Sequence, residues 1–444
     1  MKTVHRATLA GILTAFALLA LAFNLLTPLY EGYDEAEHVE YVTFVRETWS
    51  IPELPSEIFE AVQPPAYYAL QAGVSTILGL DRPPVLRGNP RVGPEDPRFY
   101  IHGISEREAP FSGGTGTVRV LRLVSTLLGL VTLLLVHATA RTVFPRRPAL
   151  ALAVTATAAF VPQFIAVHAL VNNDALGILA GALLLFAGAR LVLSGEEPPL
   201  RLAALAGGAL GLGLIAKGYA VAAIPVPFLA LAAARPSRKG FVRAAGVIVG
   251  VALLLSGWLI AINLSRYGEP WPDRAAQQHL AQTLPQTLVE RSPFDPVFRD
   301  VFLRELRDSY WYRGGFGQVQ APNAAYLTLD VLLLAVFVGA VGAAFAPTRA
   351  GLDAAQMRVL AVFAVAIFLQ FAGILYYNLS IQQYQGRWLF SVQPAIAAWM
   401  VVGVSALGGS RIPDRLLGIV PVGLVAMAVW ILFGVLAPAF APRG

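Results

Sequence analysis

Eleven apolar segments of about membrane-spanning length constrain this chain more than any other feature. A helix needs about 20 apolar residues to cross the hydrocarbon core of a bilayer, where its backbone polar groups must bond to one another. The segments are 7–29, 118–144, 149–167, 175–193, 200–216, 219–233, 242–264, 326–345, 359–377, 389–407 and 416–436. The sequence therefore predicts an all-α polytopic membrane protein with about eleven transmembrane helices, forming a single transmembrane domain over residues 1–444.

The composition agrees with this interpretation. Hydrophobic residues make up 56% of the chain and charged residues 14%, whereas about 25% of the residues of a soluble domain are charged. These values exclude a soluble enzyme, a disordered protein and a nucleic-acid reader. The chain contains no cysteine, which excludes disulfides, thiolate nucleophiles and cysteine–zinc sites.

The distribution of charge predicts the orientation. Short cytoplasmic loops of membrane proteins are rich in lysine and arginine. Fifteen of the 33 basic residues, but four of the 27 acidic ones, lie in the segments assigned to the inner side. These basic residues are Lys2, Arg6, Arg141, Arg146, Arg147, Arg190, Arg201, Arg235, Arg238, Lys239, Arg243, Arg349, Arg358, Arg411 and Arg415. We expect a plasma-membrane protein with its amino terminus inside and its carboxyl terminus outside.

Two long outer loops are expected, over residues 30–117 and 265–325. The first contains the apolar segment 64–80, which has about 17 residues and opens with two prolines. Proline suits the first turn of a helix, where its missing N–H has no partner to lose. Counting this segment as a span would reverse the charge bias of every later loop. We therefore expect a helix at the outer interface.

The first polar motif, DEAEH at 34–38, follows the first span. A helix beginning at Asp34 would bring His38 onto nearly the same face. Its apolar residues are expected to face the membrane while the acids face water, as in an interfacial helix; they are Val39, Val42, Val45 and Trp49. A solvated acidic helix start is the alternative explanation for this motif.

Three further polar groups lie at the outer ends of spans. Asp174 follows Asn173 in a short turn, where both residues could simply cap a helix. Lys217 is one of three lysines in the chain and the only one assigned to the outer side. It could bind a phosphate or extend toward lipid headgroups. Arg387 could bind phosphate through its guanidinium, or anchor the span together with Trp388.

In order along the chain, these segments resemble the GT-C superfamily of membrane glycosyltransferases. The resemblance rests on Asp34-Glu35, QPPAYY at 63–68, Asn173-Asp174, AKG at 216–218 and GRWLF at 386–390. It covers residues 30–390 and is to the branch containing protein O-mannosyltransferases and lipid A aminoarabinose transferases, nearest to poorly characterised bacterial members. Gln63 stands where that branch more often has a basic residue.

The resemblance implies a glycosyltransferase that moves a sugar from a polyprenyl phosphate to an acceptor hydroxyl on the extracytoplasmic face, with inversion. It implies that Asp34 is the general base, with Glu35 as the second catalytic candidate, and that Lys217 and Arg387 bind the donor phosphate. Residues expected to position the substrates or an ion are His38, Gln63, Tyr67, Asn173, Asp174, Trp311 and Tyr384. Asp34, Glu35, His38 and Asp174 could together hold a divalent metal ion.

Three other functions remain open at this point. The protein could be a transporter or flippase for lipid-linked sugars, which would need polar groups along a path through the membrane. It could be a non-catalytic scaffold that binds sugars or envelope partners through its outer loops. It could also be a polysaccharide ligase or polymerase with a diphosphate-linked donor. The acceptor, whether lipid, glycan or protein, is not defined by the sequence.

Overall fold

The computed structural model describes residues 2–93, 96–103, 105–348, 350–407 and 417–441, and helices dominate this part of the chain. Eight helices in it are long and apolar enough to cross a membrane: Thr3–Leu26, Gly113–Val143, Asp174–Val192, Arg238–Tyr267, Asn323–Phe345, Ala354–Tyr377, Gly386–Leu407 and Ile419–Ala439. Three shorter apolar helices, Pro148–Ala159, Leu200–Ala216 and Gly218–Ala233, occupy the other predicted segments. The all-α polytopic fold is confirmed, and the number of eleven spans stays a prediction.

Prolines explain why two predicted spans are broken. Segment 149–167 is divided into α6 (Pro148–Ala159) and α7 (Pro162–Val167), because Pro162 has no N–H for a continuing helix and instead starts a new one. Pro225 separates η2 (Gly218–Ala223) from α10 (Val226–Ala233) in the same way. Such breaks are tolerated at membrane depth where neighbouring helices surround the freed backbone groups.

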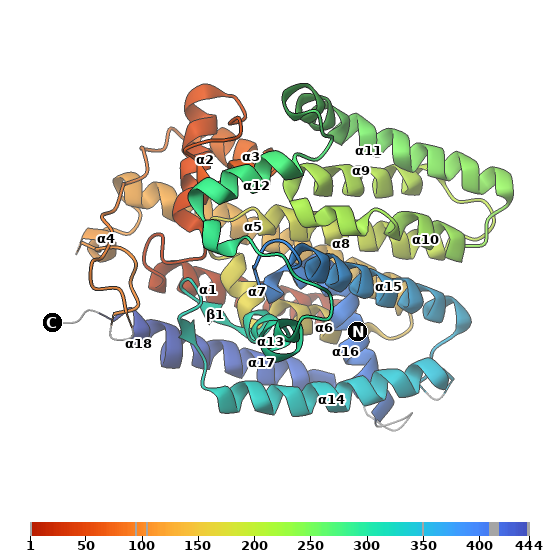
Figure 1. The fold of residues 1–444 in the computed structure, drawn as a ribbon. Helices are drawn as coiled ribbons and strands as arrows, with labels where there is room; N and C mark the ends of the chain where they lie inside the picture. The colour runs from red at the N-terminus through yellow and green to blue at the C-terminus, as the bar shows by residue number, and fades with distance from the viewer. Residues whose placement is uncertain (1, 94–95, 104, 349, 408–416, 442–444) are drawn as a thin grey trace.

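The long helices pack side by side as one bundle (Figure 1). It contains α1 (Lys2–Leu26), α5 (Gly113–Val143), α8 (Asp174–Val192), α9 (Leu200–Ala216), α11 (Arg238–Tyr267), α14 (Asn323–Phe345), α15 (Ala354–Tyr377), α16 (Gln393–Leu407) and α17 (Ile419–Trp430). Helices α9 and α11 lie against each other, and a Cβ atom at Gly207 would be 2.5 Å from the carbonyl oxygen of Ile248. Small residues that permit close backbone approach are typical of helix contacts in membranes.

The segment between α1 and α5 contains α2 (Glu35–Thr48), η1 (Phe59–Val62), α3 (Ala66–Ile77) and α4 (Ser105–Glu108). At 1.5 Å per residue, the 12 residues of α3 extend about 18 Å, too little to cross a bilayer, as the sequence predicts. One expectation for α2 is wrong. Val39, Val42 and Val45 are buried in a cluster with Tyr67 and other residues of α3 rather than facing lipid, because α3 covers that side of α2.

The segment between α11 and α14 contains α12 (Asp273–Thr283), η3 (Pro285–Thr287), η4 (Phe298–Phe302), α13 (Leu303–Trp311) and a hairpin of β1 (Arg313–Gly314) with β2 (Val319–Gln320). The chain continues from α15 through η5 (Gly386–Val392), and from α17 through η8 (Ile431–Leu436) to α18 (Ala437–Ala439). Helix α5 begins at Gly113, a few residues inside the predicted loop 30–117. Helix α11 ends at Tyr267, a few residues inside the predicted loop 265–325. Three of the predicted inner basic residues, Arg349, Arg411 and Arg415, lie outside the described residues.

Candidate active site

Two acids and two cations from four separate segments meet in one cluster. Arg387 Nε lies 3.1 Å from one carboxylate oxygen of Asp174, and Lys217 Nζ lies 3.1 Å from the other. A terminal guanidinium nitrogen of Arg387 lies 3.7 Å from the carboxylate of Asp34. Asp174, Lys217 and Arg387 are isolated charges in the sequence, whereas Asp34 belongs to the acidic motif at 34–38. A buried charge without a partner is costly. The convergence of these charges therefore stabilises each of them.

Local backbone structure places three of these side chains. Asp174 is the first residue of α8, Lys217 follows the last residue of α9, and Arg387 lies in the first turn of η5. Gly386 allows η5 to lie directly against α13, since a Cβ atom there would be 2.1 Å from the carbonyl oxygen of Leu306. No side-chain hydrogen bond caps the start of α8, so its acid serves the ion pairs rather than a helix cap.

The members of the cluster differ in exposure. The side chain of Asp174 is fully buried, and those of Lys217 and Arg387 are each 7% exposed. The Asp34 side chain is 26% exposed. Asp34 is therefore the acid of the cluster that a substrate can reach. The buried Asp174 forms ion pairs with both cations.

Asn173 and Gln63 extend the cluster toward the first outer segment. Lys217 Nζ donates a hydrogen bond to Asn173 Oδ1 at 2.5 Å. Asn173 Nδ2 in turn donates to Gln63 Oε1 at 3.1 Å. Gln63 therefore contacts the candidate phosphate-binding lysine through an amide relay, and not as a direct cationic ligand.

Tyr33 covers Arg387 from the other side. The guanidinium carbon lies 4.9 Å from the centre of the Tyr33 ring, a cation–π arrangement. Tyr33 and Arg387 line a partly open cavity together with Gln163, Asn172 and Arg313; its empty space is about 380 Å³, including solvent at its mouth. The Oδ1 atom of Asn172 in this wall is buried and accepts no hydrogen bond. A polar ligand with hydroxyl groups could satisfy it.

A second, partly open cavity has an almost wholly apolar wall; its empty space is about 420 Å³, including solvent at its mouth. It lies between α8, α9, η2, α10 and α15, and Tyr219, two residues after Lys217, forms part of its wall. The charged cluster therefore adjoins a cavity of mixed polarity beside Tyr33, which Arg387 lines, and lies near an apolar cavity within the bundle, which Tyr219 lines. An amphipathic molecule with a phosphate between its polar and apolar parts matches this order.

Glu35 is held in a separate buried ion pair. Arg122 Nε donates to its Oε1 at 2.7 Å and an Arg122 terminal nitrogen to its Oε2 at 2.5 Å, and neither side chain is exposed. The backbone N–H groups of Tyr30 and Val171 donate to the same carboxylate. With four donors, this carboxylate has an evident structural role and no contact with the charged cluster.

His38 and Glu60 form a buried polar group beside the cluster. His38 Nδ1 lies 2.9 Å from Tyr68 Oη and 3.8 Å from Glu60 Oε2. Burial, together with the charges of Lys217 and Arg387, holds the pKa of His38 well below its usual value. Burial, with a further contribution from Asp34, raises the pKa of Glu60 to about 8. Both groups are therefore mainly neutral at pH 7.

Asp34 itself has a raised pKa. Burial raises it, Arg387 and Lys217 oppose the shift, and Asp174 adds to it. Its backbone is also unusual, with φ at +54°, in the left-handed region that Asp and Asn tolerate better than most residues. Tyr30, four residues earlier, has φ at +65°. Such residues cost about 1–3 kcal/mol each and persist only where surrounding contacts hold them.

The structure does not bring every predicted residue to the cluster. Tyr67 is buried between α3 and α5, hydrogen-bonded to Ser125 and Gln71. Trp311 is buried beside Tyr310, and the hydroxyl of Tyr384 accepts from Arg291. These three aromatic residues pack around the site and do not line the cavity beside Arg387.

The suggested divalent metal site is not formed by the described residues. Within them, no group of three or more His, Cys, Asp or Glu side chains is arranged to hold a metal ion. The four residues suggested as ligands are divided among different partners: Asp34 faces Arg387, Asp174 faces two cations, Glu35 faces Arg122 and His38 faces Tyr68.

The comparisons with known proteins agree with this architecture. Residues 114–261 match the family described as dolichyl-phosphate-mannose-protein mannosyltransferase. Two solved structures are similar over 97% of this chain, each at 15% identity. They are ArnT from Cupriavidus metallidurans bound to undecaprenyl phosphate, with a TM-score of 0.55, and the archaeal oligosaccharyltransferase AglB from Archaeoglobus fulgidus with an inhibitory peptide and a dolichol-phosphate, with a TM-score of 0.50. The chain has the GT-C fold.

The comparisons match different lengths of the proteins. The chain covers 73% of the length of the ArnT structure and 55% of that of AglB. No curated protein sequence matches it. The family match begins in α5 and ends in α11, so it includes Asp174 and Lys217 but neither Asp34 nor Arg387. Those two residues lie outside the family match, and the tertiary structure brings them to Asp174 through the contacts of Arg387.

Sequence reasoning missed two residues close to the site. Arg122 is the buried partner of Glu35, and its only signal is that it forms, with Arg119, a pair of arginines near the start of a mainly apolar span. Glu60 precedes Gln63 by three residues and gives no separate signal, since it is one of several acids in that loop.

Proposed function

We propose that this protein is a glycosyltransferase that moves a sugar from a polyprenyl-phosphate donor to an acceptor hydroxyl on the extracytoplasmic side of the plasma membrane, with inversion at the anomeric carbon. The observation that carries the proposal is the cluster itself: one accessible carboxylate, Asp34, beside two buried cations, Lys217 and Arg387. Glycosyl transfer from a lipid phosphate needs a base for the acceptor and positive charge at the leaving phosphate.

In the proposed reaction, the acceptor oxygen bonds to the anomeric carbon while the bond from that carbon to the phosphate oxygen breaks. The phosphate leaves with the electron pair, and Asp34 takes the acceptor proton. The phosphate gains one negative charge as Asp34 loses one. Arg387 can therefore exchange its partner Asp34 for the phosphate, and the net charge of the site stays constant through the step.

The two cavities suggest where the donor binds. The apolar cavity next to Tyr219 would accommodate part of the polyprenyl chain, and the cavity beside Tyr33 and Arg387 would accommodate sugar hydroxyls. The lipid phosphates bound in the ArnT and AglB structures, undecaprenyl phosphate and dolichol-phosphate, support this class of donor. The proposed partners are thus a lipid-linked sugar and an unidentified lipid, glycan or protein acceptor.

The orientation of the helices supports an extracytoplasmic site. Asp174 begins α8, and Arg190 lies in its last turn at the opposite end. Arg141 likewise lies in the last turn of α5, away from the segment that contains Asp34. These two basic residues lie at the end of the bundle opposite the cluster, and by the positive-inside rule they support an extracytoplasmic cluster.

The experiment that tests the function is sugar transfer by the purified protein in detergent or liposomes. The donors are a panel of polyprenyl-phosphate sugars, and release of polyprenyl phosphate is the measured product. Transfer that requires Asp34, Lys217 and Arg387 is expected. If polyprenyl-phosphate sugars bind but none is consumed, and liposomes containing the protein move them between leaflets, a flippase replaces the enzyme. Consumption of diphosphate-linked donors alone would indicate the ligase.

A further inference from the structure

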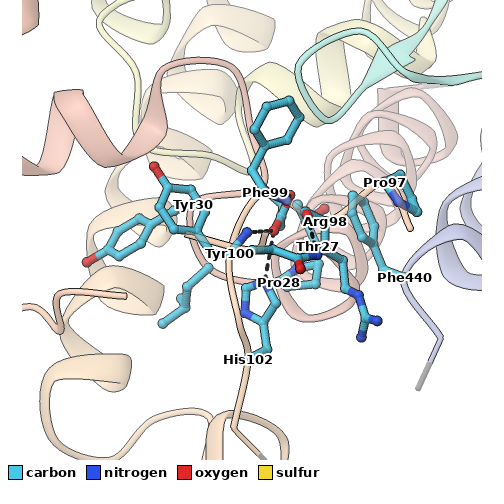
Figure 2. A network of polar contacts seen from close by, with 12 residues as sticks. Thr27, Pro28, Tyr30, Pro97, Arg98, Phe99, Tyr100, His102 and Phe440 are labelled. Atoms are coloured by element: carbon cyan, nitrogen blue, oxygen red, sulfur yellow. Dashed lines mark hydrogen bonds and ion pairs between the residues drawn. The ribbon is translucent and has the colours of Figure 1, made fainter. Parts of the chain in front are cut away.

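The short segment between α1 and α2 is held by a buried carboxylate that the proposed reaction does not use. Glu31 is fully buried. Its carboxylate accepts hydrogen bonds from the backbone N–H groups of Phe99 at 3.0 Å and Tyr100 at 2.9 Å, and lies 2.9 Å from His102 Nε2. These contacts attach the stretch 97–103 to the chain just before Tyr33 and Asp34. Figure 2 shows Phe99, Tyr100 and His102 of this stretch beside Pro28 and Tyr30.

His102 bridges two carboxylates. Its Nδ1 lies 2.7 Å from Glu106 Oε2, opposite the contact of Nε2 with Glu31. A neutral imidazole carries one N–H and can donate to only one of these oxygens. Both contacts therefore require the imidazolium, or a proton on one of the carboxylates.

The charges around His102 are balanced when it is protonated. Glu31 and Glu106 face the ring directly, and Arg119 lies 3.3 Å from Glu106. Arg98, the other cation of this stretch, is paired with Asp96. Burial lowers the pKa of His102, but the hydrogen bonds and charges of Glu106 and Glu31 outweigh it and raise this pKa above its usual value.

This network lies next to two backbone positions that need support. Tyr30 and Asp34 both have positive φ, and they enclose Glu31, Gly32 and Tyr33. On the far side, Glu35 is fixed by Arg122. Asp34 is thus presented by a short strained segment with a buried anchor at each end, Glu31 and Glu35.

We propose that Glu31, His102 and Glu106 form a clamp that positions Asp34 and the Tyr33 ring beneath Arg387, and that loss of the His102 proton releases it. This inference rests on the proposed function for its effect on transfer. His102 is here a positioning residue. It touches no substrate, and it acts by holding the segment that presents the base.

Hydrogen exchange tests the clamp without any catalysis. The two readouts are the peptides covering residues 97–103 and 30–38. In the unmodified protein, protection of both peptides, corrected for the intrinsic pH dependence of exchange, should fall as pH rises through the pKa of His102. His102→Gln should show the low protection at every pH. The matched control is His279→Gln, since His279 is also enclosed by the protein but faces a backbone carbonyl and a backbone N–H rather than carboxylates.

Transfer kinetics test the positioning. His102→Gln should lower kcat by up to about 100-fold, the scale of an error of about 1 Å in placement, and leave binding of polyprenyl phosphate unchanged. His279→Gln should keep the kcat of the unmodified protein and its pH profile. Protection of 30–38 that is independent of pH and of His102 would overturn the clamp, and so would lost protection with unchanged kcat. If the unmodified protein transfers no sugar, the proposed function fails while exchange of 30–38 still decides the clamp.

Discussion

Replacing Asp34 by Asn separates the proposed chemistry from binding and folding. Asn keeps the size of the side chain and tolerates the left-handed conformation found at this position (φ +54°), whereas Ala would add backbone strain. The Asn side chain cannot act as an effective base and remove the proton of the acceptor hydroxyl. Asp34→Asn is therefore the substitution at this position that changes least besides basicity.

The expected loss follows from the role of the base. General-base assistance contributes about 10²–10⁴-fold to rate, which is about 2.7–5.4 kcal/mol at 1.36 kcal/mol per factor of ten. Donor binding should be unchanged or tighter, because Arg387 loses its partner at 3.7 Å and becomes free for the phosphate. Folding stability should change by less than about 1 kcal/mol, because the side chain is partly exposed and its ion pair is long.

The assay is transfer from a polyprenyl-phosphate sugar, with donor binding and thermal unfolding measured on the same preparation. The matched control is Glu47→Gln on α2, which removes an acid whose ion pair with Arg82 is exposed. Transfer by a folded Asp34→Asn protein within tenfold of the unmodified rate would refute the assignment of the base. A loss of donor binding equal to the loss of turnover would show instead that Asp34 shapes the donor site.

Four further results are expected. Lys217→Ala and Arg387→Ala should each weaken polyprenyl-phosphate binding about tenfold or more, since charge-assisted hydrogen bonds contribute about 1.5–3 kcal/mol; unchanged binding in both would remove them from the phosphate site. Arg122→Leu should lower stability by about 3–5 kcal/mol by leaving a buried carboxylate unpaired, and an unchanged unfolding temperature would contradict the ion pair. Glu60→Gln should stabilise the protein, and the gain should grow from about pH 4.5 to pH 8 and reach a few kcal/mol at the upper end. The reason is that the folded protein retains a proton on Glu60 that the unfolded chain has released. A gain that grows as the pH falls would contradict the raised pKa of Glu60. Ser56→Cys should react with an impermeant thiol reagent only from outside the cell, and labelling from the cytoplasm alone would invert the topology.

The sequence alone determined the features that depend on local chemistry. Long apolar segments cannot leave the bilayer without losing their burial, so the polytopic helical fold followed from them. Proline at 162 and 225 ended helices for a reason that acts within a few residues. The acidic motif at 34–38 and the isolated charges at 174, 217 and 387 indicated a site, because an unpaired charge at the end of a span is costly and implies a partner.

Only the tertiary structure decided which partners those charges have. Asp34 and Glu35 are adjacent in sequence, yet one faces Arg387 and the other faces Arg122, 87 residues away in α5. The valines of α2 pack against α3. A pattern of apolar residues cannot show whether such a face is covered by another helix or by lipid. Burial, with a contribution from Asp34, raises the pKa of Glu60. The pKa of His102 is raised by the carboxylates of Glu106 and Glu31, against the effect of burial. Pairing between distant segments depends on how the helices pack, and helix packing is not encoded in the local periodicity from which spans are read.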